Sequence, residues 1–483
     1  MSDVAPIVAT SGAPKEIELR RVLGPVHLIM LGIGAIVGAG IFVITGHAAA
    51  EHAGPAVVIS FVIAGTGCLF AGLCYAEFAS MIPVAGSAYT YAYATMGGFI
   101  AWFIGWNLVL EYLVAASTVA VGWSGYFTDF MHNVGVNIPA ALSNAPLDFS
   151  ATNQIVTTGA LVNIPAAAIV LFLTAILVVG VRESATFNGL MVLVKVAVVL
   201  MVIIFGFSHI DAKNLTPFIP PNTGTYGEFG WTGILAASSL IFFAYIGFDA
   251  VSVAAQEAKN PQRDMPIGIL GSLFVCTILY ILMALVLTGI VPFETLSSKL
   301  TAHPVSTAVS SIPDLAWLGT FVNVGASVGL ASVIFVSLYG QSRIFYSMAR
   351  DGFLPPLFSQ VHPKYRTPYR GIIVTGVFAA IGAALLPLNI LGELVSIGTL
   401  MAFAVVCLGI LVLRVQRPKA KRYFRTPYAW IVAPLGVLTC GAMMYALPIG
   451  TWWRLGIWTA IGFLIYFIYG VWHLKKPQWK IEE

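Results

Sequence analysis

Long apolar runs follow one another along the chain, separated by short segments rich in Pro, Gly and charged residues. A transmembrane helix needs roughly 20 such residues. The pattern predicts twelve spans, over residues 24–49, 55–82, 97–127, 160–180, 187–208, 231–256, 266–291, 316–346, 369–387, 391–413, 428–448 and 452–473. Transmembrane β-barrels are excluded, because their strands show short alternating patterns rather than unbroken apolar runs.

The spans predict a single all-α membrane domain, because no loop is long enough for a separate catalytic domain. Five spans fall in the first unit and five in the second, and five is odd, so the second unit must lie inverted to the first. Two further helices follow this repeat. The predicted divisions are a tail over 1–22, a membrane domain over 23–474 with repeats 24–208 and 231–414 and extra helices 428–473, and a tail over 475–483.

Composition agrees with lipid as the solvent. The 483 residues are 59% hydrophobic and only 9% charged, whereas soluble domains carry roughly 25% charged residues. Most of the 24 Lys and Arg residues fall on one side if the N-terminus is cytoplasmic. The positive-inside rule therefore predicts cytoplasmic N- and C-termini in a plasma membrane, such as a bacterial inner membrane. This distribution gives no reason to expect a nucleic-acid partner.

Two spans contain helix-breaking residues at matching depths. Gly38-Ala39-Gly40 lies midway along the first span, and Ile246-Gly247 lies midway along the sixth. Interrupted helices in corresponding positions of two halves point to the binding site of a transporter. Gly34-x-x-x-Gly38 is also typical of close packing between helices, and this alternative stays open.

The chemistry of an interrupted helix suits a zwitterion. Unwinding exposes N–H groups at the start of the second half-helix, and these favour a carboxylate. Carbonyl groups at the end of the first half-helix favour an ammonium. An amino acid carries both charges on one carbon, so two broken helices could bind it without a charged side chain.

Several motifs carry a family resemblance. Residues 34–42, GAIVGAGIF, and 83–89, PVAGSAY, resemble the amino acid–polyamine–organocation superfamily. Residues 105–112, GWNLVLEY, and 243–249, FAYIGFD, followed by 257–261, EAKNP, resemble its cationic amino acid transporter branch. The resemblance covers about residues 20 to 415 and implies the leucine-transporter fold and alternating access.

The resemblance also implies a substrate site. It places the substrate carboxylate on the amides around Ala39 and Gly40, and the amino group on the carbonyls of Ile36, Phe243 and Ile246. Phe243 would act as a gate over the substrate. Relatives often carry Ser or Thr where this chain has Ala39, so the carboxylate would have backbone donors only. The complete predicted set is Ile36, Gly38, Ala39, Gly40, Phe243, Ala244, Ile246, Asp249 and Ser337. Ser337 would contribute from the eighth span, with Asn323 as a weaker candidate.

Ionisable residues inside the spans mark candidate proton carriers, because a buried charge is costly. Lys195 lies in the fifth span, where some proton-coupled relatives place a lysine in the position that binds sodium in others. The alternative is a structural lysine held by carbonyls of the first or eighth span. Glu111 could belong to a proton network or link two helices. Asp249 could face the cavity or simply cap the second half-helix, and Glu77 is expected to be structural.

These residues favour proton-coupled symport of neutral or cationic L-amino acids, or both, by alternating access. An amino acid exchanger without net proton coupling is the alternative. We expect no cofactor, with H⁺ as the coupling ion. An enzyme would need a convergent catalytic constellation, and a channel would need a continuous polar path; the sequence indicates neither. L-amino acids and membrane lipid are the expected partners, and a small membrane-protein partner cannot be read from the sequence.

Overall fold

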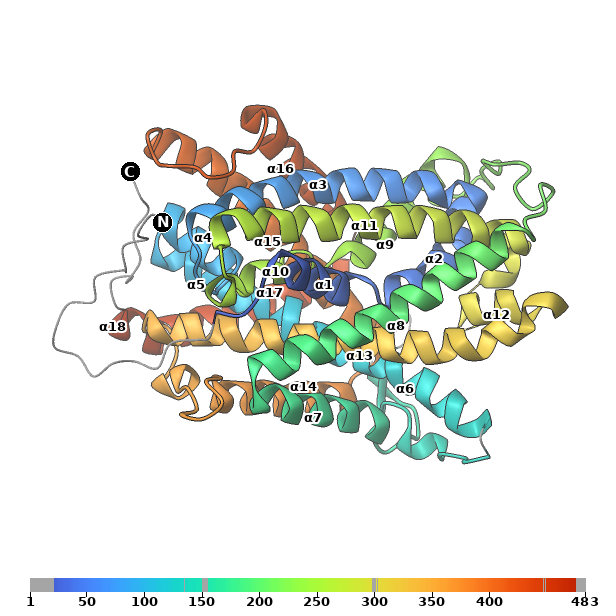
Figure 1. Cartoon of the computed structure of the whole chain (residues 1–483), viewed down its shortest axis with the longest axis horizontal. Coiled ribbons are helices and arrows are strands. Elements are labelled where there is room, and N and C mark those ends of the chain that lie inside the picture. The colour runs from blue at the N-terminus through green and yellow to red at the C-terminus, as the bar shows by residue number, and fades with distance from the viewer. Residues whose placement is uncertain are drawn as a thin grey trace.

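The structure is a computed structural model that describes residues 21–133, 135–149, 155–297, 301, 303–445, 447 and 449–474. Most helices run side by side along the long axis of the molecule (Figure 1). The α-helices are α1 (Pro25–Ile36), α2 (Thr45–Ala48), α3 (Val57–Met81), α4 (Ala88–Met96), α5 (Gly98–Val109), α6 (Ala115–Asn133), α7 (Ile164–Val179), α8 (Val181–Phe207), α9 (Gly230–Tyr245), α10 (Ala250–Val253), α11 (Pro261–Ile290), α12 (Pro304–Ser310), α13 (Ala316–Arg350), α14 (Tyr369–Leu385), α15 (Leu388–Gln416), α16 (Ala429–Tyr445), α17 (Ile449–Ile465) and α18 (Val471–His473).

The predicted all-α membrane architecture of about twelve spans is confirmed. Among the described residues, eight helical stretches are long and apolar enough to cross a membrane. Four shorter apolar helices complete the set, namely α1, α7, α14 and α16. Several spans are continued by π-helical turns, as where Leu110–Val114 joins α5 to α6.

The predicted boundaries hold to within a few residues at most ends, but several elements differ. Helix α8 begins at Val181, earlier than the predicted span, and α13 continues to Arg350. The short helix α4 was not predicted, because its nine residues are too few to span a bilayer. A small antiparallel hairpin pairs β1 (Leu147–Phe149) with β2 (Ile155–Thr157) in a predicted loop.

Helix α1 lies at the centre of the bundle (Figure 1), packed against α11, α8 and α13. Helix α3 packs against both α11 and α9, while α14 pairs with α7 and α15 with α16. The interrupted first and sixth spans therefore meet inside the protein. Irregular backbone at membrane depth is tolerated there, because neighbouring helices and cavities replace lipid.

Candidate functional site

The first span unwinds where the glycines predict it. Helix α1 ends at Ile36, and Val37 takes an extended conformation with ψ of 100°. Winding resumes in a π-helical turn over Gly40–Ile44. The packing interpretation of Gly38 also holds, since a Cβ there would lie 2.6 Å from Cγ2 of Val333.

The sixth span unwinds at the same depth. Helix α9 ends at Tyr245, Ile246 is extended with ψ of 133°, and α10 begins at Ala250. Gly247 has a φ of +118°, a region that L side chains rarely adopt, and a Cβ there would lie 2.7 Å from that of Ala35. The two breaks therefore cross in close contact, which requires glycine.

A cavity opens between the two breaks. The predicted site residues Ile36, Gly38, Ala39, Gly40, Glu111, Phe243, Ile246, Asp249 and Ser337 all line it. Apolar side chains fill much of the remaining wall, among them Ala115, Val119, Val333, Val336 and Val395. Ala244 and Asn323 do not appear among the described lining residues. Ala244 instead packs behind the site, where a Cβ on Gly40 would meet its Cβ at 2.3 Å.

Two carboxyl groups from different spans meet at this cavity. Asp249 Oδ2 accepts hydrogen bonds from the Tyr112 hydroxyl and, at 3.4 Å, from Ser87 Oγ. Asp249 Oδ1 and both oxygens of Glu111 have no hydrogen-bond partner among the described residues. These buried acceptors are available to a ligand or a proton.

Asp249 occupies the N-cap position of α10, but its side chain makes no capping hydrogen bond. The interpretation as a side-chain cap is therefore wrong, because the carboxyl points toward Tyr112 and Ser87. The sequence analysis does not predict Tyr112 and Ser87 as site residues. Tyr112 directly follows Glu111, yet only the tertiary structure shows that its hydroxyl reaches another span.

The Tyr280 hydroxyl contacts a backbone carbonyl at the C-terminal end of both α1 and α9. Tyr280 Oη, from α11, lies 2.7 Å from the Ile36 carbonyl oxygen and 2.8 Å from that of Ala244. It links the first and sixth spans directly behind the cavity. Carbonyl oxygens have two lone pairs, so Ile36 keeps acceptor capacity for a substrate ammonium. The sequence offered no signal for Tyr280 beyond a hydroxyl within an apolar span.

Lys195 is fully buried and does not line the cavity. Its Nζ donates to the carbonyl of Gly34 at 2.9 Å, to that of Val37 at 2.7 Å and to Ser332 Oγ at 2.6 Å. A protonated lysine has three N–H donors, and three acceptors surround it. Two acceptors come from the C-terminal end of α1 and its cap residue, and the third comes from α13. These contacts agree with the alternative in which the first and eighth spans hold the lysine in place. Ser332 was not singled out in the sequence, although it is a polar residue in an apolar run.

A buried ion pair lies along α13 from the cavity, toward one end of the bundle. Glu257 accepts from Arg343 at 3.1 Å and from the Tyr339 hydroxyl at 2.6 Å. Both charged side chains are 1% exposed. Arg343 follows Ser337 by six residues on α13, a rise of about 9 Å. The same end of the bundle carries the basic loops over residues 350–370 and 414–425. We call this end the basic face.

The interrupted helices, the cavity between them and the buried carboxyls are typical of a membrane carrier. The chain belongs to the amino acid permease family, whose model matches residues 23–472. The resemblance to the amino acid–polyamine–organocation superfamily is thereby confirmed.

Three relatives show the breadth of this family. The methylthioribose transporter of Bacillus subtilis (strain 168) is 44% identical over 464 residues, or 96% of each chain. The branched-chain amino acid permease BcaP of the same organism is 43% identical over 98% of this chain and 97% of its own. The vacuolar cationic amino acid transporter 4 of Arabidopsis thaliana is 39% identical over 83% of this chain and 64% of its own.

Proposed function

We propose that the protein is a proton-coupled amino acid symporter that works by alternating access. The observation that carries the coupling is the contact of the Lys195 ammonium with the carbonyls of Gly34 and Val37. These carbonyls lie at the C-terminal end of α1, directly before and at the break. The neighbouring residues Ala35, Ile36 and Gly38 line the cavity. Loss of the proton removes one donor from the lysine, so a carbonyl at the break loses its partner. Proton binding and the shape of the substrate site are then linked.

The amino acid backbone binds to the peptide groups at the breaks. Its carboxylate lies at the amides around Ala39 and Gly40, where a helical segment begins and the first N–H groups lack intrahelical partners. Its ammonium lies at the carbonyls of Ile36, Phe243 and Ile246. Phe243 covers the substrate, and Ala39 contributes no hydroxyl. Backbone donors alone therefore hold the carboxylate.

The side-chain end of the cavity suits both neutral and cationic amino acids. Val333 and Val336 offer apolar contact, and Ser337 leaves room beside them. Glu111 and Asp249 present acceptor oxygens, which a cationic side chain would neutralise. The carboxyls also provide a place for a proton when a neutral substrate is bound.

Proteoliposome uptake of labelled alanine under an imposed pH gradient tests the coupling. We expect an inward-acid gradient to drive accumulation, and Lys195→Ala to abolish the response to the gradient. Lys213→Ala, at an exposed position in the loop after α8, is the matched control and should respond as the unmodified protein does. Counterflow that ignores the gradient would support the exchanger, and a Lys195→Ala protein that remains coupled would contradict the proposal.

A competition panel identifies the substrate. Uptake of labelled alanine and arginine is challenged with each of the twenty amino acids and with methylthioribose, which has neither an amino nor a carboxyl group. We expect amino acids to compete and methylthioribose to be without effect. The reverse result would show that the peptide groups at the breaks do not select a zwitterion.

A further inference from the structure

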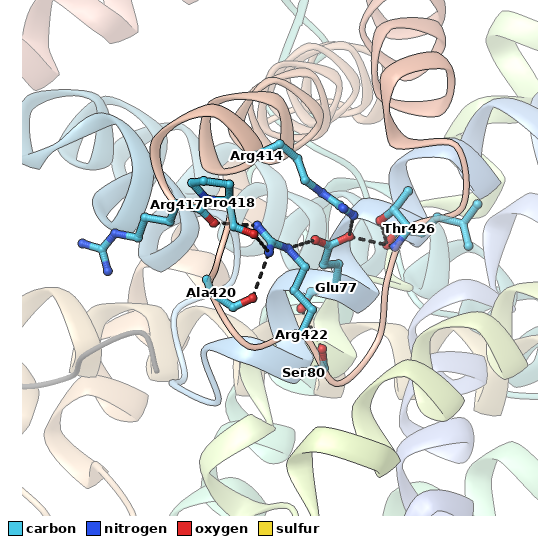
Figure 2. A network of polar contacts seen from close by, with 9 residues as sticks. Glu77, Ser80, Arg414, Arg417, Pro418, Ala420, Arg422 and Thr426 are labelled. Carbon is cyan, nitrogen blue, oxygen red and sulfur yellow. Dashed lines mark hydrogen bonds and ion pairs between the residues drawn. The ribbon is translucent and has the colours of Figure 1, made fainter. Parts of the chain in front are cut away.

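A buried carboxylate organises the loop between α15 and α16 on the basic face. Glu77 of α3 is fully buried and accepts from Arg414 Nη2 at 2.8 Å and from Arg422 Nε at 3.1 Å. The backbone N–H of Thr426 also donates to it, at 2.7 Å. Figure 2 shows how these groups converge on one carboxylate. The structural role expected for Glu77 agrees with these contacts.

Arg422 uses its remaining donors to fold the loop around itself. Its Nη1 donates to the carbonyls of Pro418 and Ala420, and its Nη2 to that of Arg417. The side chain of Arg422 is only 1% exposed. The guanidinium thus fixes the backbone from Arg417 onward, so this loop has a defined shape.

The fixed backbone directs alternate side chains outward. Ala420, Arg422 and Thr426 face the protein, while the odd-numbered positions between them are exposed. In Figure 2 the side chain of Arg417 points away from the network. We call the exposed cations the basic row; its members are Arg417, Lys419, Lys421 and Arg425.

The charge of this segment is one-sided. Residues 414–425 contain six Lys or Arg residues and no Asp or Glu. The single carboxylate of Glu77 cannot neutralise both of its arginines, so the cluster behind the basic row is itself positive. An anion at the row therefore experiences the field of the whole cluster.

The basic row lies at the level expected of lipid headgroups. It connects the ends of two membrane helices, and Tyr428 and Trp430 follow it at the start of α16, 82% and 63% exposed. Exposed tyrosine and tryptophan mark the membrane–water interface, and clusters of Lys and Arg next to a membrane helix attract anionic lipids. We propose that the basic row binds the phosphate groups of anionic phospholipids in the adjoining leaflet.

Native mass spectrometry of the purified full-length protein tests this site. The probes are dioleoylphosphatidylglycerol and, as a neutral lipid, dioleoylphosphatidylcholine. The test variant is Arg417→Gln/Lys419→Gln/Lys421→Gln/Arg425→Gln. The control removes four other exposed cations of the loops assigned to the same face, in Arg263→Gln/Lys364→Gln/Arg366→Gln/Arg370→Gln. Elution volume and thermal stability establish that both variants are folded.

We expect the test variant to bind phosphatidylglycerol about tenfold more weakly, because each cation near an anionic surface contributes about fivefold and their effects overlap. The control should lose clearly less than the test variant, because its four cations are divided between the start of α11 and the segment leading into α14 rather than gathered in one row. Phosphatidylcholine binding should not change in either variant. Equal losses in both variants, or no loss in the test variant, would overturn the proposal. Displacement of the lipid by millimolar inorganic phosphate at constant ionic strength would also overturn it, because it would identify a free-anion site.

Discussion

Ser332 shows how one hydroxyl can connect three helices. It accepts from Lys195 at 2.6 Å and donates to the Gly34 carbonyl, 3.0 Å away. The lysine, the broken helix α1 and α13 therefore share a single network. Buried networks of this kind are costly when one member is removed, because the others remain desolvated.

Ser332→Ala should therefore destabilise the protein and impair uptake. Hydrogen bonds to a charged group contribute about 1.5–3 kcal/mol, and the lysine would keep only the carbonyls of Gly34 and Val37. Thermal unfolding in detergent and alanine uptake measure the effect. Ser327→Ala is the control, because the Ser327 hydroxyl donates within its own helix to Asn323. Similar behaviour of the two variants would contradict the role given to Ser332.

Asp351 provides a pH-dependent contribution to stability outside the spans. Burial raises its pKa from 3.8 to about 6, and the hydrogen bond from Tyr89 limits this rise. The distance between Tyr89 Oη and Asp351 Oδ2 is 2.6 Å. The folded chain binds this proton more tightly than the unfolded chain. Stability from this group is therefore present at acidic pH and is lost as the pH rises through about 6.

Tyr89→Phe should lower the melting temperature more at pH 8 than at pH 5. At pH 8 the buried carboxylate is charged and loses its donor, at a cost of about 1.5–3 kcal/mol. At pH 5 the carboxyl is largely protonated and the loss is smaller. Thermal unfolding in detergent across this range measures the difference. In an Asp351→Asn background the pH dependence of the Tyr89→Phe effect should vanish, and its persistence would assign the effect to another group.

At the scale of helices, the close crossing of the two breaks depends on glycine. A Cβ on Gly40 would lie 2.3 Å from Cβ and 2.6 Å from Cα of Ala244. Because one of these atoms is backbone, the clash cannot be relieved by turning a side chain. The unwound segments would have to separate.

Gly40→Ala should therefore abolish uptake and lower stability by about 1–3 kcal/mol, as overpacking does. Transport assays and thermal unfolding test this directly. Gly441→Ala is a matched control in α16, since nothing lies within 4 Å of its added Cβ. The control should be neutral or stabilising by up to about 1 kcal/mol, because alanine favours helix. Uptake by the Gly40→Ala protein at the normal rate would contradict this prediction, because it would show that the first and sixth spans can move apart without loss of transport.

The positions of the helix breaks could be predicted from the sequence, because glycine interrupts an apolar run locally. Gly38–Gly40 and Ile246–Gly247 coincide with the observed unwinding, and the cavity lies between them. The contacts of Tyr280 and Ser332 could not be predicted, since they join residues far apart in the chain. Ala244 is predicted to belong to the site, yet it does not line the cavity and packs against Gly40 instead. Local patterns thus locate a break, while its supporting contacts depend on the packing of other helices.

At the scale of the whole molecule, the basic loops distinguish the two ends of the bundle. The basic row and the Glu257–Arg343 pair both lie toward the end that charge predicts to be cytoplasmic. The loop after α8, with Lys213 exposed, belongs to the opposite end. The orientation of the chain therefore determines whether the basic row and the loop with Lys213 face the cytoplasm or the outside. It also determines the direction in which a proton moves past Lys195.

Cysteine labelling tests this orientation with little background, because all five native cysteines are buried. We expect a membrane-impermeant maleimide to label Lys213→Cys in intact cells. Lys419→Cys should react only after the membrane is permeabilised, since positive loops stay on the cytoplasmic side. The unmodified protein provides the background in both conditions. Labelling of Lys419→Cys in intact cells, with Lys213→Cys protected, would reverse the topology and place the basic row against the outer leaflet.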